Sequence, residues 1–243
     1  MLVLALDTTT RAGSVAVAKD GRVLDLLAGD PGRPHAERVP ADLVRSLERA
    51  GAALSDVDVF AVAIGPGSFT GLRIGIAAIQ GCAFAAGRPV VGVSALEALA
   101  LAASGSRPPE KGLRLGVWMD AQRQEVFSAL YDISGPGPEA NLDAIEGPAV
   151  GSPASTAARW HQVLGGSWCA VAGDGAMKYS QLLSETAGAP VHVIAPPPLA
   201  ATIALVAERR ARAGEGTVPH AIRPLYVRRS DAELARDRRR GSA

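Results

Sequence analysis

Short apolar segments that recur twice in the same order are the feature that most constrains the fold of this chain. In the first half, the runs Leu2–Leu6, Ser14–Ala18 and Arg22–Leu27 predict three strands. The dipeptide Asp20-Gly21 favours a tight hairpin turn between the last two, because both residues tolerate positive φ. The apolar pattern then predicts helix, strand, helix, strand and helix at Ala36–Ala50, Val57–Ile64, Leu72–Ala86, Val90–Val93 and Ala95–Ala103.

The second half repeats this order of elements. Strands are predicted at Leu113–Met119, Glu125–Tyr131 and Ile145–Val150. Helix, strand, helix, strand and helix follow at Pro153–Leu164, Cys169–Ala172, Met177–Thr186, Val191–Ile194 and Leu199–Ala213. Each half therefore predicts a mixed sheet flanked by helices, which makes the chain a two-lobed protein of the α/β class.

The expected lobes are residues 1–105 and 106–222, with a linker at Ser104–Lys111. In this arrangement the last helix, residues 199–213, can pack back on the first lobe. A basic tail follows at residues 223–243, with seven arginines against three acidic residues. Two interpretations of the tail stay open, a solvated chain end or a short arm that contacts RNA or an acidic partner.

The composition excludes several classes of protein. Hydrophobic residues make up 48% of the 243 residues, which is enough for a sizeable core, and the net charge of +1 lacks the basic excess of a typical nucleic-acid binder. Cys82 and Cys169 are too few and too far apart for a disulfide framework, which fits a reducing compartment. Because neither a signal peptide nor about 18 uninterrupted apolar residues is found, we expect a cytoplasmic protein without a membrane span.

A glycine-rich loop, Gly65–Gly71, connects a predicted strand to a predicted helix. Such a loop can present backbone N–H groups to a phosphate at the start of the helix. The signature G-x-x-x-x-G-K-[ST] is absent, and the spacing G-x-G-x-x-x-G is one residue too long for the dinucleotide fingerprint. The loop is therefore either a tight turn that brings helix and strand together or a weak phosphate contact.

Asp7 ends the first strand and is followed by three threonines. A carboxylate beside hydroxyl groups at that end of a strand can hold Mg²⁺ and position phosphate, but Asp and Thr are also ordinary turn residues. Gly173-Asp174-Gly175 takes a comparable position in the second half, and a simple turn is expected there. Together with the glycine-rich loop, the candidate contacts for a nucleotide or phosphate are Asp7, Thr8, Thr9, Gly65, Gly67 and Ser68.

Small residues form a narrow stripe along the helix that follows this loop. Their spacing of four, three, four and three places them on one side of the helix: Gly71, Gly75, Ala78, Cys82 and Ala85. Each glycine inside a helix costs about 1 kcal/mol relative to alanine, and close approach by another element commonly offsets that cost. The approaching element is either the sheet of the same lobe or another subunit.

The sequence offers few catalytic groups. The four histidines are too far apart to form a helical metal-binding pair: His35, His161, His192 and His220. Neither the zinc-peptidase motif H-E-x-x-H nor the hydrolase motif G-x-S-x-G occurs. Glu97 is a lone carboxylate on a predicted helix and is expected to be solvated. We therefore predict no catalytic residue and no metal site.

Several of these segments resemble the bacterial TsaB (YeaZ) family. The strongest resemblance is the run from Gly65 to Gly75, GPGSFTGLRIG. Supporting segments are Leu4–Ala16, His35–Pro40, Gly92–Leu96, Met119–Phe127 and Pro224–Arg228, so the resemblance extends over nearly the whole chain. It implies the two-lobed actin/Hsp70-like (ASKHA, ribonuclease H-like) fold.

The resemblance also implies a function in making N6-threonylcarbamoyladenosine at position 37 of tRNAs that read ANN codons. In that family the paralogous partner TsaD performs the chemistry, TsaB binds TsaD or a second copy of itself through helices of the first lobe, and the ATPase TsaE completes the complex. The interface implied here comprises Gly71, Arg73, Gly75, Ala78, Cys82 and Ala85. The chain itself would need no cofactor, would bind ATP or ADP weakly at most, and would meet tRNA only through the complex.

One segment separates a subunit from an enzyme. The catalytic paralogue carries H-x-E-G-H, whose histidines hold a metal, where this chain has Ala95-Leu96-Glu97-Ala98-Leu99. Ala95 and Leu99 have no lone pair for a metal, so the resemblance implies a non-catalytic subunit. The alternative is an ATP-dependent small-molecule kinase or an active carbamoyl transferase that uses Asp7 with Asp120 or Asp174 across a cleft. A peptidase is the third hypothesis.

Overall fold

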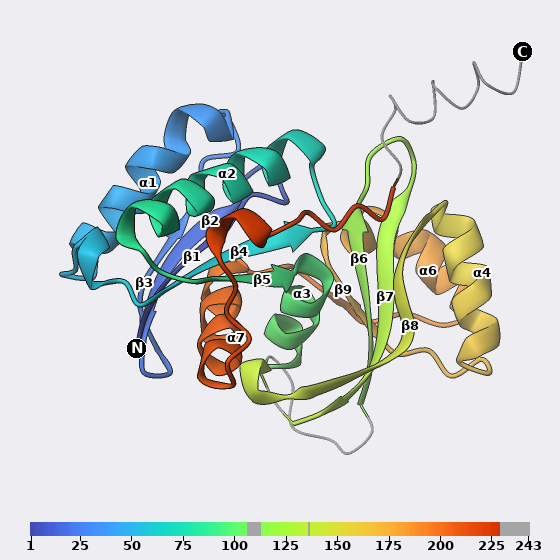
Figure 1. The fold of residues 1–243 in the computed structure, drawn as a ribbon. Coiled ribbons are helices and arrows are strands. Elements are labelled where there is room, and N and C mark those ends of the chain that lie inside the picture. Colours follow the sequence, from blue (N-terminus) through green and yellow to red (C-terminus); the bar gives the residue numbers. More distant parts are fainter. Residues whose placement is uncertain (106–112, 136, 229–243) are drawn as a thin grey trace, which may run out of the picture.

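A computed structural model describes residues 1–105, 113–135 and 137–228 of the chain. Two lobes are visible, each built on one five-stranded sheet (Figure 1). The predicted two-lobed α/β fold with a mixed sheet in each lobe is thereby confirmed. Residues 106–111 of the predicted linker and residues 229–243 of the predicted tail lie outside the described residues.

The first sheet has the strand order β3-β2-β1-β4-β5. The strands β1 (Leu2–Asp7), β2 (Ser14–Lys19) and β3 (Arg22–Ala28) form an antiparallel meander. The strands β4 (Val59–Gly65) and β5 (Val90–Ser94) run parallel to β1. The carboxyl ends of β1 and β4 therefore lie side by side, and the loops that leave them meet at one edge of the sheet.

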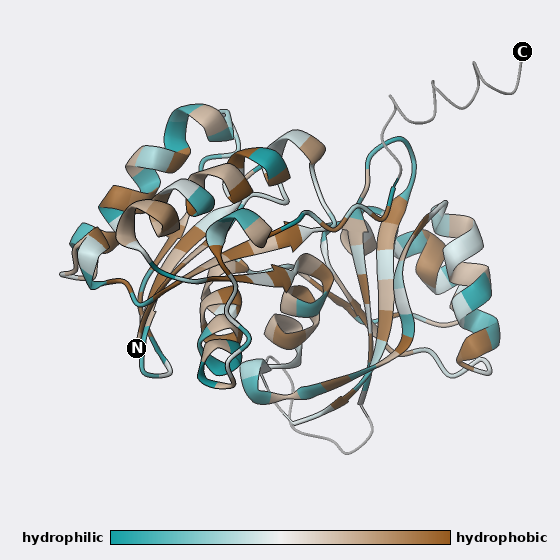
Figure 2. Cartoon of the chain, viewed as in Figure 1, coloured by the Kyte–Doolittle hydropathy of each residue, from teal (hydrophilic) through white to brown (hydrophobic). Residues whose placement is uncertain are grey.

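The strand β1 is buried on both faces, which explains its unbroken apolar sequence. Leu2, Leu4 and Leu6 point to the face covered by α1 (His35–Arg49) and α2 (Phe69–Ala86). Val3 and Ala5 point to the opposite face. Figure 2 shows that the strands of this sheet are largely apolar.

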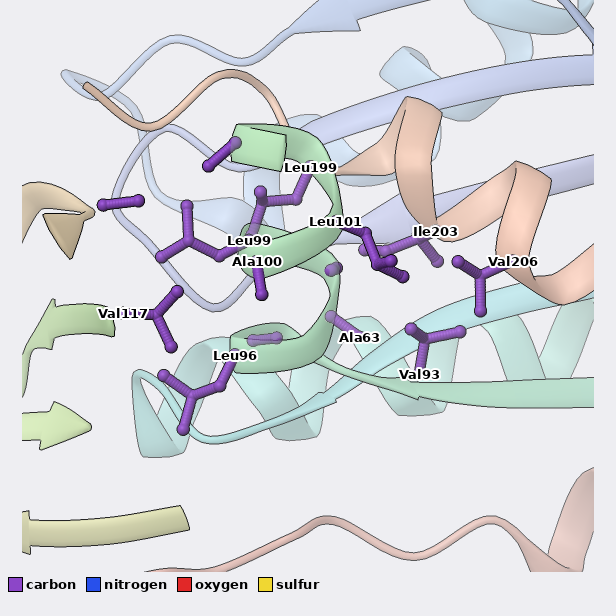
Figure 3. Close-up of a cluster of buried hydrophobic side chains, with 14 of the residues drawn as sticks. Ala63, Val93, Leu96, Leu99, Ala100, Leu101, Val117, Leu199, Ile203 and Val206 are labelled. Carbon is purple, nitrogen blue, oxygen red and sulfur yellow. The ribbon is translucent and has the colours of Figure 1, made fainter. Parts of the chain in front are cut away.

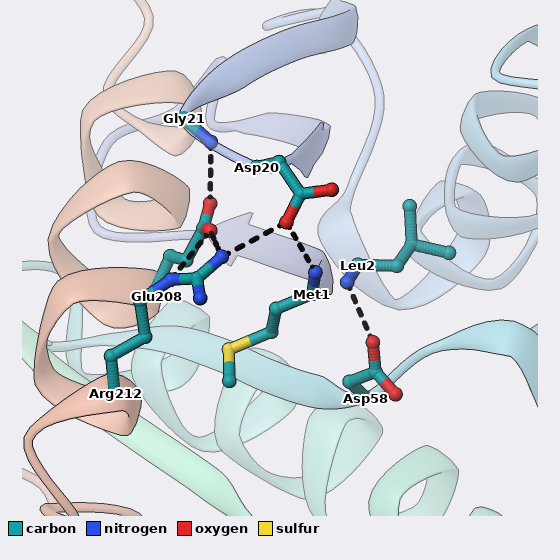
Figure 4. Close-up of polar contacts among 7 residues, drawn as sticks. All are labelled: Met1, Leu2, Asp20, Gly21, Asp58, Glu208 and Arg212. Atoms are coloured by element: carbon teal, nitrogen blue, oxygen red, sulfur yellow. Dashed lines mark hydrogen bonds and ion pairs between the residues drawn. The ribbon is translucent and has the colours of Figure 1, made fainter.

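The helix α7 (Ala200–Arg212) covers that opposite face of the first sheet, although it follows the whole second lobe in sequence. Glu208 Oε2 accepts a hydrogen bond from Gly21 N at 2.9 Å, and Arg212 forms an ion pair with Asp20 at 2.9 Å (Figure 4). Both contacts lie at the hairpin between β2 and β3. The first lobe is therefore completed by a helix from the C-terminal part of the chain.

The second sheet has the order β10-β9-β6-β7-β8. Its strands are β6 (Leu113–Asp120), β7 (Val126–Ser134), β8 (Asn141–Gly151), β9 (Ala170–Ala172) and β10 (Val193–Ile194). If the strands of each lobe are numbered separately in chain order, both sheets have the strand order 3-2-1-4-5. The repeat of element order in the sequence thus corresponds to a repeat in topology.

The helices of the second lobe are α4 (Pro153–Val163), α5 (Asp174–Lys178) and α6 (Ser180–Ala187). The short 3₁₀ helices are η1 (Leu54–Asp56), η2 (Gly137–Glu139) and η3 (Pro219–Ala221). The remaining helix, α3 (Ala95–Ser104), lies between the lobes and contacts both sheets. Its leucines join Val117 of the second lobe and Ile203 of α7 in one continuous core (Figure 3).

Three predicted elements of the second lobe differ from the structure. The single helix expected at Met177–Thr186 is two helices, because Tyr179, with φ −114° and ψ 25°, leaves the helical conformation between α5 and α6. The turn expected at Gly173-Asp174-Gly175 is instead the first turn of α5, whose start Gly173 caps. The strand expected at Ile145–Val150 is the longer β8, whose polar residues reflect an exposed position at the sheet edge.

The helix α2 is long and apolar enough, by length and composition, to cross a membrane. Packing within the chain explains this apolar composition, because Leu72, Ile76 and Ile79 are buried in the first lobe. Polar residues of the same helix also have partners within the chain, since Gln80 Nε2 donates to the Pro219 carbonyl at 2.9 Å.

Candidate functional site

A cleft of about 1240 Å³ lies between the two lobes. The first lobe contributes the end of β1 with the following turn and the loop before α2. The second lobe contributes the end of β6, the turn after it and Asp174. The chain segments Pro196–Leu199 and Leu225–Arg228 also line it. Three carboxylates from three different elements, Asp7, Asp120 and Asp174, therefore border one cavity.

The carboxylate of Asp7 is buried at the end of β1. Its Oδ1 accepts hydrogen bonds from Thr9 N at 2.9 Å and from Thr9 Oγ1 at 2.6 Å. Burial raises the pKa of the Asp7 carboxyl, while these two bonds and the nearby charge of Arg38 oppose the rise. The Asp-Thr-Thr sequence therefore forms a local turn in which Asp7 Oδ1 already accepts two hydrogen bonds.

His35 supports the turn after β1 from the start of α1. Its Nε2 lies 2.9 Å from the Thr10 carbonyl and its Nδ1 lies 2.8 Å from an Arg38 nitrogen. Because a carbonyl only accepts and a guanidinium only donates, Nε2 carries the hydrogen and the ring is neutral. Burial lowers the pKa of His35, and the charge of Arg38 lowers it further. Arg38 itself is buried and forms an ion pair with Asp42 at 2.8 Å.

The glycine-rich loop lies directly against this turn. Ser68 N donates to the Thr9 carbonyl at 2.9 Å, and a Cβ atom at Gly67 would lie 2.6 Å from Thr9 Cβ. The side chain of Ser68 caps α2 by accepting from Gly71 N at 3.2 Å. The helix begins at Phe69, three residues earlier than predicted. The glycines thus allow a close approach of loop and strand.

The six candidate phosphate contacts do not all border the cleft. Asp7, Thr9, Gly67 and Ser68 line it. Thr8 is not among the lining residues, because its side chain is buried and points to α2. Gly65 is also not among them, and a Cβ atom there would lie 2.8 Å from the Leu225 carbonyl. A phosphate contact stays a prediction for all six residues, of which four border the cleft.

The two carboxylates of the second lobe already have partners. Asp120 Oδ2 accepts from Lys178 Nζ at 2.9 Å, and Asp120 Oδ1 accepts from Gln122 N at 3.0 Å. Asp174 Oδ1 accepts from the backbone N–H groups of Asp120 and Gly175, both at 2.9 Å. Within the described ranges, no group of three or more His, Cys, Asp or Glu residues is arranged to hold a metal ion.

The segment Ala95–Leu99 forms the first turns of α3. Ala95 and Leu99 are buried in the core between the lobes. The expectation that Glu97 is solvated is wrong, because both of its carboxylate oxygens accept from Arg210 NH2, at 2.8 and 2.9 Å. Arg210 lies on α7, more than a hundred positions away in sequence, so no residue near Glu97 indicates this pair.

The stripe of small residues on α2 is divided between two environments. A Cβ atom at Gly71 would lie 2.2 Å from the Thr8 carbonyl, and one at Gly75 would lie 2.1 Å from Thr8 Oγ1. Both glycines therefore pack against the lobe's own β1 turn. Ala78 and Cys82 are half-buried, whereas Arg73 and Ala85 are exposed.

A second face of α2, which shares only Ala85 with that stripe, is open to solvent, and the sequence analysis missed its other residues. Phe84 is 82% exposed, and Val44 on the neighbouring α1 is 56% exposed. Gly81 and Ala77 lie one and two turns before Ala85 on this face and are also exposed. We call the set Val44, Ala77, Gly81, Phe84 and Ala85 the α1/α2 apolar face. The spacing of the small residues pointed to α2, but only the fold shows which of its sides is free.

Comparisons with known proteins agree on one family. A family model described as TsaD, tRNA N6-adenosine threonylcarbamoyltransferase, matches residues 30–236. The tRNA threonylcarbamoyladenosine biosynthesis protein TsaB of Escherichia coli is 39% identical over 131 residues, which cover 54% of this chain and 55% of that protein. The TsaB protein of Haemophilus influenzae is 38% identical over 129 residues, 52% of each. The matches thus span about half the length of these curated relatives.

Two solved structures are similar over almost the full chain. YeaZ from Pseudomonas aeruginosa is 32% identical, with a TM-score of 0.71, and the match covers 93% of this chain and 99% of that one. A Pseudomonas aeruginosa protein described as similar to the peptidase YEAZ is 33% identical, with a TM-score of 0.77 and the same coverage. The structural comparison therefore extends the similarity to both lobes.

Proposed function

Because this chain belongs to the family of the tRNA N6-adenosine threonylcarbamoyltransferase TsaD and to its TsaB/YeaZ relatives, we propose that it is a non-catalytic subunit in N6-threonylcarbamoyladenosine biosynthesis. The main support is the segment Ala95–Leu99. At the positions where the catalytic paralogue carries its metal-binding histidines, this chain has Ala95 and Leu99, and both side chains are buried in the interlobe core. Glu97, between them, is paired with Arg210.

The proposed partner is a TsaD-type subunit, and the proposed contact is the α1/α2 apolar face. Phe84, which is 82% exposed, is the largest apolar side chain of this face, and contiguous exposed apolar residues are typical of a surface that a partner covers. The small residues Ala77 and Gly81 beside it would let a partner helix approach closely. The same face would serve a homodimer. TsaE and tRNA would join through the assembled complex, in the cytoplasm.

The test of this face uses a large charged residue at an exposed position. Gly81→Arg adds a charge where a Cβ atom has nothing within 4 Å, so the variant should fold. Ala158→Arg on the exposed side of α4 is the matched control in the other lobe. We expect Gly81→Arg to lose co-purification with the cognate TsaD and to stop tRNA modification by the mixture, whereas Ala158→Arg keeps both. Binding by folded Gly81→Arg at wild-type strength would contradict the proposed interface.

The residues of the interface implied by the resemblance fall into two groups, those packed inside the lobe and those that a partner can reach. Gly71 and Gly75 are proposed to act from inside the lobe, by fixing the position of α2 on Thr8. Arg73, Ala78, Cys82 and Ala85 are the members that a partner can reach. A large side chain at Gly75 does not test the interface, because it would clash with Thr8 before it reached a partner.

A second function has one observation in its favour. The cleft brings Asp7, Asp120 and Asp174 to one cavity, as an ATP-dependent kinase or an active carbamoyl transferase would require. Against it, Lys178 and backbone N–H groups already bind two of the three carboxylates. We propose that ATP or ADP binds weakly there at most and that no cofactor is required. Turnover of ATP·Mg²⁺ by the isolated chain would favour the enzyme.

A further inference from the structure

The segment Leu225–Arg228 crosses from the first lobe to the second at the mouth of the cleft (Figure 1). Leu225 N donates to the Ile64 carbonyl at 2.7 Å, next to the end of β4. The backbone at Gly65 is so close that a Cβ atom there would lie 2.8 Å from the Leu225 carbonyl. The start of the segment is therefore attached to the central sheet of the first lobe.

Tyr226 extends the attachment to the start of α2. Its ring stacks on Phe69 with 5.2 Å between the ring centroids. Arg73 Nε donates to the Tyr226 hydroxyl at 3.2 Å, and the Arg73 guanidinium lies 4.0 Å from the centroid of the Phe69 ring. Aromatic stacking and a cation–π contact thus hold this residue beside α2.

Arg228 makes the contacts on the second lobe. One guanidinium nitrogen donates to the Ala121 carbonyl at 2.9 Å, and another pairs with the Glu125 carboxylate. The guanidinium also lies 5.6 Å from the centroid of the Phe127 ring. A single side chain therefore contacts both ends of the turn Ala121–Glu125.

That turn has an unusual backbone. Gln122, Arg123 and Gln124 have φ values of 59°, 53° and 59°. Three consecutive residues with a side chain in the left-handed region are unfavourable, because Cβ then crowds the following carbonyl. Two backbone hydrogen bonds close the turn, from Glu125 N to the Gln122 carbonyl at 2.9 Å and from Ala121 N to the Glu125 carbonyl at 3.0 Å. At its start, the Asp120 carboxylate also accepts from Gln122 N at 3.0 Å and from Gln122 Nε2 at 3.1 Å.

We propose that Leu225–Arg228 is a clasp that joins the two lobes across the cleft and holds the turn Ala121–Glu125 in its left-handed conformation. Arg228 provides the hold, because it fixes the Ala121 carbonyl and the Glu125 side chain relative to each other. Leu225 and Tyr226 anchor the clasp to the first lobe. The clasp depends on these contacts and not on the partner proposed above.

Hydrogen exchange of the full chain, followed by mass spectrometry, tests the clasp. In Arg228→Ala we expect the amides of Ala121 and Glu125 to exchange at least about tenfold faster, because the turn can leave its left-handed conformation. Arg114→Ala is the control, since it removes an exposed ion pair with Asp132 in the same lobe. Wild-type exchange of the turn in folded Arg228→Ala, or equal acceleration in Arg114→Ala, would overturn the proposal.

A second variant separates release of the turn from general loosening of the lobe. Gln124→Gly places a residue that accepts positive φ in the turn, so the turn should need the clasp less. We expect the acceleration caused by Arg228→Ala to be smaller in the Gln124→Gly background, and an unchanged acceleration would count against the proposal. If Arg228→Ala does not fold, Arg228→Lys supplies the test, because its ammonium can reach Glu125 but cannot make both contacts.

A distance measurement tests whether the clasp holds the two lobes together. Spin labels on Arg45→Cys of α1 and Ala158→Cys of α4, in a background with Cys82→Ser and Cys169→Ser, report the distance between the lobes. We expect a narrow distance distribution with the clasp intact and a broader one in Arg228→Ala. Identical distributions would show that other contacts fix the lobes and would overturn this part of the proposal.

Discussion

Thr8 and Gly75 are packed so closely that a Cβ atom at position 75 would lie 2.1 Å from the Thr8 hydroxyl oxygen. Thr8 follows directly on Asp7 at the end of β1, and Gly75 lies in the second turn of α2. The contact therefore sets how near the helix lies to the turn that carries Asp7. It also explains a glycine in a helix interior, where glycine is otherwise unfavourable.

Gly75→Ala should destabilise the fold despite the better helix propensity of alanine. We expect a loss of about 1–3 kcal/mol in the free energy of unfolding, measured by urea titration, because the added methyl group overpacks the contact. In a Thr8→Ala background the loss should shrink, since the clashing hydroxyl is gone. The control is Gly81→Ala, where the Cβ atom has open space and a gain of up to about 1 kcal/mol is expected.

Asp7→Asn should stabilise the fold near neutral pH. The buried carboxyl has a raised pKa, so its ionised form opposes folding once the pH is above that pKa. Asparagine keeps an acceptor at the Oδ1 position, where both bonds from Thr9 end. Urea titrations over a pH series should show an advantage of the variant that disappears as the pH falls through the pKa of Asp7. An advantage independent of pH would argue against a buried charge.

His35→Gln should change how stability depends on mild acid. The pKa of His35 is lowered from 6.5 in the folded state, so the unfolded chain takes up the proton more readily. The stability that neutral His35 supplies is complete above pH 6.5 and is lost as the pH falls below it. Glutamine can donate to the Thr10 carbonyl and accept from Arg38 without titrating. We expect the wild type to lose stability relative to the variant below that pH, and parallel curves would refute the assignment.

Restoring histidines at the positions of Ala95 and Leu99 should not create a metal site. Both side chains are in the interlobe core, so the double variant Ala95→His/Leu99→His should lose about 2–5 kcal/mol of stability through overpacking and polar burial. The control pair Ala154→His/Ala158→His has the same spacing on the exposed side of α4. Calorimetry should detect Zn²⁺ binding by the control pair only. Tight Zn²⁺ binding by the core pair would contradict this prediction.

The order of the elements could be predicted because each strand of the sheet interior is a short run of apolar residues. Leu2–Asp7 is buried on both faces, so every residue carries the signal. The strand β8 shows little of this apolar signal, because an edge strand with one exposed face tolerates polar residues such as Asp143 and Glu146. The break at Tyr179 could not be predicted either, since neither proline nor glycine marks it.

The candidate site was only partly predictable, because its contacts join distant parts of the chain. The carboxyl ends of β1 and β6 could be named from the sequence, and both Asp7 and Asp120 border the cleft. The pair of Glu97 with Arg210 and the contact of Arg228 with Ala121 link residues more than a hundred positions apart. The spacing of Gly71 and Gly75 showed that something approaches α2 but left open whether it was the same lobe or a partner.

The position of α7 has a consequence for how the chain is synthesised. In the sheet made first on the ribosome, the part of the apolar face that α7 covers stays open until Ala200–Arg212 has left the exit tunnel, after the whole second lobe. Residues 1–105 alone would therefore expose apolar surface that α7 covers in the folded chain, and such surface favours aggregation. Despite its bilobed outline, the molecule must mature as one cooperative unit.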